Sequence, residues 1–235
     1  VGADHVAMIL GARIERAPLV TLGVDIGTNT EICLRVPGEQ KMVSVSCASG
    51  PAFEGAHIRD GMRAASGAIE KVRIASDGVE LVTIDHEPPV GICGSGILDA
   101  MAELYTHGLI ARNGRFVRDH PRLRLRDGSP AFVLAPAAQS GSGKDILVTQ
   151  EDVNEIQLAK GAIQAGINIL LEDSGLPPEA VQEVIVAGAF GSYLNIENAV
   201  RAGLFPNLPN AGYRQVGNAA AVGARWMLIS RTARA

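Results

Sequence analysis

The two ends of this 235-residue chain carry different hydrophobic patterns, and their succession restricts the fold to a few architectures. Near the N-terminus, three strand-like segments follow one another closely, at 19–26, 31–36 and 41–47. After Thr149 the pattern changes to alternating helices and strands. The elements expected there are a long helix from Thr149 to about Gly175, a strand at 184–187, a helix at 196–202, a strand at 213–216 and a helix at 219–229. A meander followed by this alternation predicts a mixed α/β sheet whose later strands are parallel and covered by helices.

The segment between these two patterns is less regular, and we interpret 49–148 as a large insertion in a single lobe. The core of that lobe then comprises 19–48 and 149–230, preceded by a helix over 2–16. Within the insertion we expect a hairpin at 71–84, a helix at 97–106, two short strands at 132–134 and 146–148, and a solvated or partner-facing arginine strip at 112–126. Thr149 is expected to cap the long helix, with Asp152 completing a capping box.

Composition excludes several classes of protein. The net charge of −4 and pI near 5.8 argue against a general nucleic-acid binder, which needs a basic face. No apolar run approaches the roughly 18 residues of a membrane-spanning helix, so we expect no membrane contact. Cys33, Cys47 and Cys93 are far apart and lack C-x-x-C spacing, so we expect unpaired thiols, no iron–sulfur cluster in this chain and a cytoplasmic location.

The first chemical motif is Asp25-Ile26-Gly27-Thr28-Asn29, where a strand leads an Asp into a glycine-containing hairpin turn. Gly27 would let a ligand approach the backbone, and the amides of Thr28 and Asn29 could donate to phosphate oxygens. Asp25 could hold a hydrated Mg²⁺, which keeps several waters and takes one or two carboxylates. The alternative is an ordinary hairpin whose Asp and Asn stabilise the turn.

The second motif is the apolar strand 184–187 and the turn that follows it, Gly188-Ala189-Phe190-Gly191. Its small residues would let a flat base or sugar lie against the backbone, beyond the carboxyl end of a parallel strand. The alternative is a tight strand-to-helix turn. A third motif at 217–224, where Asn218 opens the last helix, is rich in small residues, and close helix packing is the favoured interpretation there.

Together these motifs resemble the ATPase superfamily of actin, sugar kinases and heat-shock chaperones, abbreviated ASKHA. In that resemblance Asp25 to Thr28 is a phosphate motif, 186–191 an adenosine motif and 217–224 the second connecting helix. A more specific resemblance is to the ATP-dependent reductive activators of corrinoid proteins. It is carried by the stretches 24–29, 48–56, 92–96 and 188–191.

The resemblance implies a ribonuclease-H-like lobe of the ASKHA type. In such activators a [2Fe-2S] domain supplies electrons, and an ATPase domain drives the reduction of cob(II)alamin to cob(I)alamin. Two related lobes close on the nucleotide, each with an Asp-x-Gly hairpin, whereas this chain has one such hairpin. We therefore expect the second lobe alone, with the first lobe and the iron–sulfur domain absent from this chain and little or no ATP turnover.

The resemblance also implies roles for particular residues. Asp25 is the catalytic candidate and would bind Mg²⁺ through water. The residues expected to line ATP are Gly27, Thr28 and Asn29 at the phosphates, Gly188, Ala189, Phe190 and Gly191 at the adenosine, and Asn218. The expected partner is a corrinoid protein or methyltransferase, and a second copy of the chain is another. Two other functions stay open, a small-molecule kinase lobe and a non-catalytic docking module.

Overall fold

The computed structural model describes residues 1–75, 78–111, 113–117, 120–188 and 190–232, and the chain divides into two compact units. Unit 1 comprises Val1–Ser49, Gly161–Leu194 and Phe205–Ala235. Unit 2 comprises Gly50–Lys160 and Asn195–Leu204. Unit 2 thus contains 50–148 of the expected insertion together with the first part of the long helix and 195–204.

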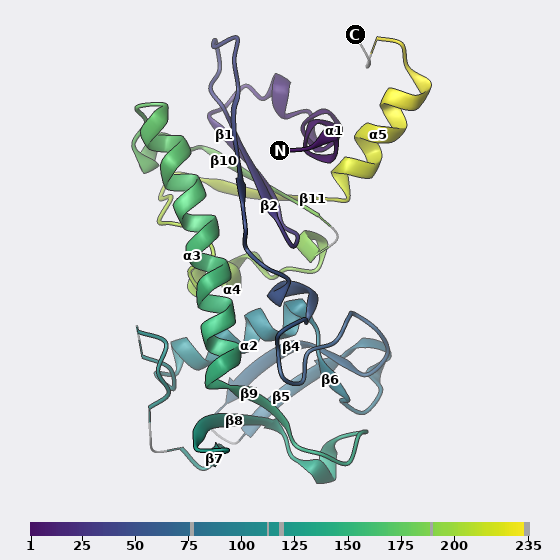
Figure 1. The fold of residues 1–235 in the computed structure, drawn as a ribbon, viewed down its shortest axis with the longest axis vertical. Coiled ribbons are helices and arrows are strands. Elements are labelled where there is room, and N and C mark those ends of the chain that lie inside the picture. Colours follow the sequence, from purple (N-terminus) through teal and green to yellow (C-terminus); the bar gives the residue numbers. More distant parts are fainter. Residues whose placement is uncertain (76–77, 112, 118–119, 189, 233–235) are drawn as a thin grey trace. The chain divides into compact units, whose positions relative to one another are not determined.

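Unit 1 is built on a five-stranded sheet in the order β11-β10-β1-β2-β3 (Figure 1). Its strands are β1 (Thr21–Asp25), β2 (Thr30–Arg35), β3 (Val43–Cys47), β10 (Glu183–Ala187) and β11 (Gly212–Gly217). The first three pair antiparallel as a meander, and β10 and β11 join β1 in parallel. The predicted mixed sheet with parallel later strands is confirmed.

Two helices of unit 1, α1 (Ala3–Ala12) and α5 (Ala219–Ile229), pack on each other closely. A Cβ atom added to Gly223 would lie 1.8 Å from the carbonyl oxygen of Ala7, and one added to Gly11 would lie 2.1 Å from that of Ala219. The small residues of the third motif therefore serve helix packing, as the favoured interpretation predicted.

The first helix is shorter than the expected 2–16. It ends at Ala12 because Arg13 adopts a left-handed conformation with φ of 58°, and its amide donates to the carbonyls of Ile9 and Leu10. A 3-10 turn at Ile14–Arg16 follows. The apolar spacing extends beyond the true end because Ile14 is also fully buried, although it lies outside the helix.

The long helix α3 (Gln150–Asp173) begins where the sequence predicts. The amide of Asp152 donates to Oγ1 of Thr149 at 3.2 Å, and the amide of Thr149 donates to Oδ2 of Asp152 at 2.8 Å. This reciprocal capping box satisfies two amides that the first turn of a helix leaves without intrahelical partners.

Unit 2 contains two three-stranded sheets, the helices α2 (Gly94–Thr106) and α4 (Ile196–Arg201), and the first part of α3. One sheet has the order β5-β4-β6, from β4 (Ala68–Ala75), β5 (Gly78–Thr83) and β6 (Gly91–Ile92). The other has the order β7-β8-β9, from β7 (Leu123–Arg126), β8 (Ser129–Ala135) and β9 (Ile146–Thr149).

Strand β7 is absent from the sequence-based prediction, which treats that stretch as part of an arginine strip. Its four residues alternate Leu and Arg, and all of them are at least partly exposed, so the strand forms by pairing with β8 rather than by burial. Across the described part of the chain, no helix combines the length and apolarity needed to cross a bilayer.

Candidate functional site

Three parallel strands of unit 1 end together, and the first two motifs follow these ends directly. Asp25 at the end of β1 is in register with Ala187 of β10, and Ala187 is in register with Gly217 of β11. Hydrogen bonds continue past the strands, because the amide of Ile26 donates to Ala187 and that of Gly188 donates to Gly217. Strands β1, β10 and β11 lie side by side in Figure 1. Ligands of open α/β sheets bind at such carboxyl ends.

Asp25 lies between the two motif turns and is partly buried. Its Oδ1 atom lies 2.9 Å from the position that a Cβ atom on Gly188 would occupy, so the carboxylate packs against the second turn. Burial raises the pKa of Asp25 above its usual value, and the nearby carboxylates of Asp4 and Glu31 raise it further. A carboxylate disfavoured in this way gains from a bound cation.

The first turn contains a glycine that the fold itself does not require. Gly27 is not among the described residues with positive φ. A Cβ atom added there would meet only the carbonyl oxygen of Asn29, at 3.4 Å, which is an ordinary van der Waals contact. The backbone at Gly27 therefore has room for a small group, next to the exposed residues Thr28 and Asn29.

The glycines of the second turn have structural reasons instead. Gly188 has φ of 95°, and a Cβ atom there would lie 2.7 Å from the carbonyl oxygen of Ile26. At Gly191 a Cβ atom would lie 3.1 Å from Cγ1 of Val186. Phe190 is partly buried and begins a 3-10 turn at Phe190–Ser192, and Ala189 lies outside the described residues. The tight-turn interpretation thus accounts for both glycines, and adenosine binding stays a prediction.

Asn218 also has a structural task. Its side-chain oxygen accepts a hydrogen bond from the amide of Ala221 at 2.9 Å, which makes it the N-cap of α5. The prediction that Asn218 contacts nucleotide is not tested by this contact.

Two residues that contact the motif turns have no role predicted from the sequence. Ser49, just beyond β3, places its hydroxyl against the first turn, within 3.0 Å of the Gly27 carbonyl oxygen. Gln215 of β11 donates through Nε2 to the carbonyls of Gly191 and Leu194, the latter at 2.8 Å. Neither contact could be inferred from spacing, because each joins segments that are brought together only by the sheet.

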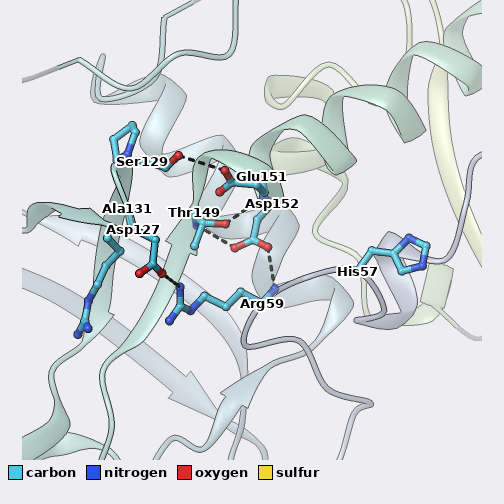
Figure 2. Close-up of a pocket in the computed structure, with 10 residues that line it drawn as sticks. His57, Arg59, Asp127, Ser129, Ala131, Thr149, Glu151 and Asp152 are labelled. Carbon is cyan, nitrogen blue, oxygen red and sulfur yellow. Dashed lines mark hydrogen bonds and ion pairs between the residues drawn. The ribbon is translucent and has the colours of Figure 1, made fainter.

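Unit 2 contains a separate cavity of about 350 Å³, shown in Figure 2. It is lined by His57, Arg59, Arg126, Asp127, Ser129, Pro130, Ala131, Thr149, Glu151 and Asp152. Its polar groups interact with one another: Arg59 is 3.8 Å from Asp127, Ser129 donates to Glu151, and Asp152 accepts from the Arg59 amide at 2.7 Å. These contacts serve the capping of α3 and the β7–β8 turn, and the cavity shares no residue with the predicted site.

Asp60 also serves the fold of unit 2. Its Oδ2 atom accepts a hydrogen bond from the amide of Leu147 at 2.8 Å, which anchors strand β9. Within the described residues, no group of three or more His, Cys, Asp or Glu side chains is arranged to hold a metal ion. A single carboxylate such as Asp25 is compatible with a cation bound mainly by phosphates and water.

Comparisons with known proteins converge on one family. The family described as the C-terminal domain of RACo, the ASKHA domain, matches residues 19–235. The chain is 39% identical over 240 residues to the corrinoid activation enzyme RamQ of Eubacterium limosum, covering 98% of this chain and 40% of that protein. It is 29% identical over 258 residues to a [Co(II) methylated amine-specific corrinoid protein] reductase of Methanosarcina barkeri, covering 99% of this chain and 43% of that protein.

A solved structure described as a reductive activator for corrinoid, iron-sulfur protein has the same fold as this chain. It matches with a TM-score of 0.90 and 42% sequence identity, over 100% of this chain and 38% of that structure's chain. This chain thus spans about two fifths of the length of each of these relatives. The mixed α/β ASKHA lobe expected from the resemblance is confirmed.

Proposed function

This chain belongs to the family of RACo C-terminal ASKHA domains, and on that premise we propose that it is the nucleotide-binding lobe of an ATP-dependent reductive activator of corrinoid proteins. The observation that carries the proposal is the first turn. A Cβ atom added to Gly27 there would make only an ordinary contact, and the turn holds two exposed residues beside a partly buried carboxylate whose raised pKa favours a bound cation.

The residues present fit a magnesium-bound nucleotide. The amides of Thr28 and Asn29 would bind phosphate oxygens, since successive backbone amides in a turn form an anion-binding concavity. Asp25 would hold Mg²⁺ through water. Gly188, Phe190 and Gly191 would face the adenosine from the end of the neighbouring strand, and Asn218 would lie at the start of the adjacent helix.

The redox chemistry of such an activator would be supplied from outside these 235 residues. Cys33, Cys47 and Cys93 are all free and buried. Burial raises the pKa of Cys33 to about 12, so this thiol stays protonated and is a poor metal ligand. We therefore assign to this chain the binding of ATP, and to a corrinoid protein the role of partner. Family membership favours this function over a small-molecule kinase lobe.

A titration of this chain with Mg-ATP tests the proposal, with Asp25→Asn as the variant. We expect measurable binding by the unchanged chain, weakened at least about tenfold by Asp25→Asn, which corresponds to about 1.4 kcal/mol. Asp127→Asn is the matched control, because Asp127 is highly exposed and belongs to unit 2. No binding by the unchanged chain, or equal affinity in both variants, contradicts the proposal.

A second measurement concerns catalysis. Because the chain carries one Asp-x-Gly hairpin, we expect it to hydrolyse ATP slowly or not at all, since phosphoryl transfer depends on positioning and charge neutralisation from both sides of the nucleotide. Robust hydrolysis that Asp25→Ala abolishes would show instead that one lobe is sufficient.

A further inference from the structure

The hydroxyl of Ser49 forms a small buried network beneath the turn Ile26 to Asn29, which we call the phosphate hairpin. Ser49 is 5% exposed and Thr30 is fully buried. The Ser49 Oγ atom lies 3.0 Å from the Gly27 carbonyl oxygen, 3.4 Å from the Thr28 carbonyl oxygen and 2.8 Å from Oγ1 of Thr30. Three segments, β2, the hairpin and the end of β3, therefore meet at one side chain.

The donors in this network follow from the single proton of a serine hydroxyl. Both carbonyls can only accept, so the Ser49 proton is directed toward them and closer to Gly27. The remaining contact is then made by Thr30, whose hydroxyl donates to the oxygen of Ser49. Thr30 thereby orients Ser49, and Ser49 orients the two peptide groups of the hairpin.

Because a peptide group is planar, this contact also fixes the direction of the N–H groups on the opposite side of the hairpin. In a trans peptide group the N–H points opposite to the C=O. A Gly27 carbonyl held toward Ser49 directs the amide of Thr28 away from Ser49, and a Thr28 carbonyl held there directs the amide of Asn29 the same way. Ser49 is buried, whereas Thr28 and Asn29 are exposed, so both amides are directed toward the exposed side of the turn.

We propose that Ser49, supported by Thr30, is a positioning residue that presents the amides of Thr28 and Asn29 to the phosphates of the nucleotide. This inference rests on the proposed function and deepens it. Ser49 makes no contact with ligand itself. Its effect is limited to the phosphate end, because its described partners are Thr30, the hairpin carbonyls and the carbonyl of Cys47.

The test compares two ligands, Mg-ATP and adenosine, in this chain and its Ser49→Ala variant. We expect Ser49→Ala to weaken Mg-ATP binding by about threefold to tenfold, which corresponds to about 0.6–1.4 kcal/mol and is typical of one hydrogen bond. The affinity for adenosine should be unchanged, because adenosine lacks the phosphates that the amides would bind. Equal weakening of both ligands, or no weakening of Mg-ATP, overturns the inference.

Thr21→Val is the matched control. Thr21 is fully buried, its hydroxyl also donates to a carbonyl, that of Leu19 at 2.9 Å, and it lies at the opposite end of β1 from the hairpin. If Thr21→Val lost as much affinity for Mg-ATP as Ser49→Ala, the loss of any buried hydroxyl would weaken binding, and the inference would be wrong. Thr30→Val keeps Ser49 but removes the hydroxyl that donates to it, so this variant should also weaken Mg-ATP binding. It replaces Ser49→Ala in the experiment if Ser49→Ala does not fold.

A nucleotide-free measurement separates this inference from the proposed function. In the ¹⁵N spectrum of the chain without ligand, Ser49→Ala should shift the amide resonances of Thr28 and Asn29, whereas Thr21→Val should leave them in place. Unshifted resonances contradict the role of Ser49. Shifted resonances in a chain that binds no Mg-ATP would support the contact between Ser49 and the hairpin. They would contradict a role of that contact in nucleotide binding.

Discussion

The two turns at the carboxyl edge of the unit 1 sheet both contain glycine, but for opposite reasons. At Gly188 the φ of 95° and the approach of the Ile26 carbonyl leave no room for a side chain. At Gly27 the backbone is not in the left-handed region, and a Cβ atom would make only ordinary contact. Gly188 is required by the fold, whereas Gly27 leaves room beside the backbone that a ligand can use.

This difference shows that a glycine-containing motif does not by itself distinguish a structural glycine from one that borders a ligand. A short Gly-containing stretch between a strand and a turn has many causes, and its sequence is the same for each. Only the distance from an added Cβ atom to its neighbours separates packing from access. Substitutions at Gly188, Gly27 and Asp25 therefore separate what the fold requires from what a ligand requires.

Gly188→Ala should destabilise the chain by about 2–4 kcal/mol, because the variant combines a left-handed backbone with a backbone clash. Chemical denaturation followed by circular dichroism measures the loss. Gly161→Ala is the control, since Gly161 is exposed in α3 with no atom within 4 Å of the added Cβ. That control should gain up to about 1 kcal/mol from helix propensity. A Gly188→Ala variant as stable as the unchanged chain would remove the contrast between the two turns.

Gly27→Ala should change the free energy of unfolding by less than about 0.5 kcal/mol, the usual range for a surface substitution. Its affinity for Mg-ATP should fall by about tenfold, since the methyl group occupies the space beside the phosphate-binding amides. Parallel denaturation and calorimetric titration measure the two quantities. A large loss of stability would show that the fold needs this glycine too.

Asp25→Asn should make the chain slightly more stable at neutral pH while it weakens nucleotide binding. Burial and the carboxylates of Asp4 and Glu31 raise the pKa of Asp25 in the folded chain. The folded state therefore binds more protons than the unfolded state, and its stability falls as the pH rises through and above the usual Asp range of about 3.9. Asn has no such dependence.

Melting temperatures of the unchanged chain and of Asp25→Asn, measured across pH, test the direction of this pH dependence. The advantage of Asp25→Asn should be present at pH 7 and disappear once the pH is below the usual Asp pKa. An advantage that persists in acid, or an Asn variant less stable at pH 7, contradicts the electrostatic origin. Such a stability cost at a charged site is typical of residues retained for function.

Much of the local structure was predictable because short-range chemistry decides it. Thr149 and Asp152 form the expected capping box, and α5 spans the expected 219–229. The misses have tertiary causes. Strand β7 has no burial pattern of its own and depends on β8. Helix α1 ends at Ala12, before the left-handed Arg13, although Ile14 continues the apolar spacing into the core.

The sequence by itself determined the order of the elements, the mixed sheet and the placement of Asp25, Gly27 and Gly188 after strand ends, because hydrophobic period and turn residues are local signals. The tertiary structure alone decided which glycine is structural, that Gln215 holds the second turn, and that Ser49 lies beneath the phosphate hairpin. Those properties depend on distances between segments far apart in the chain, and such distances exist only once the sheet has formed.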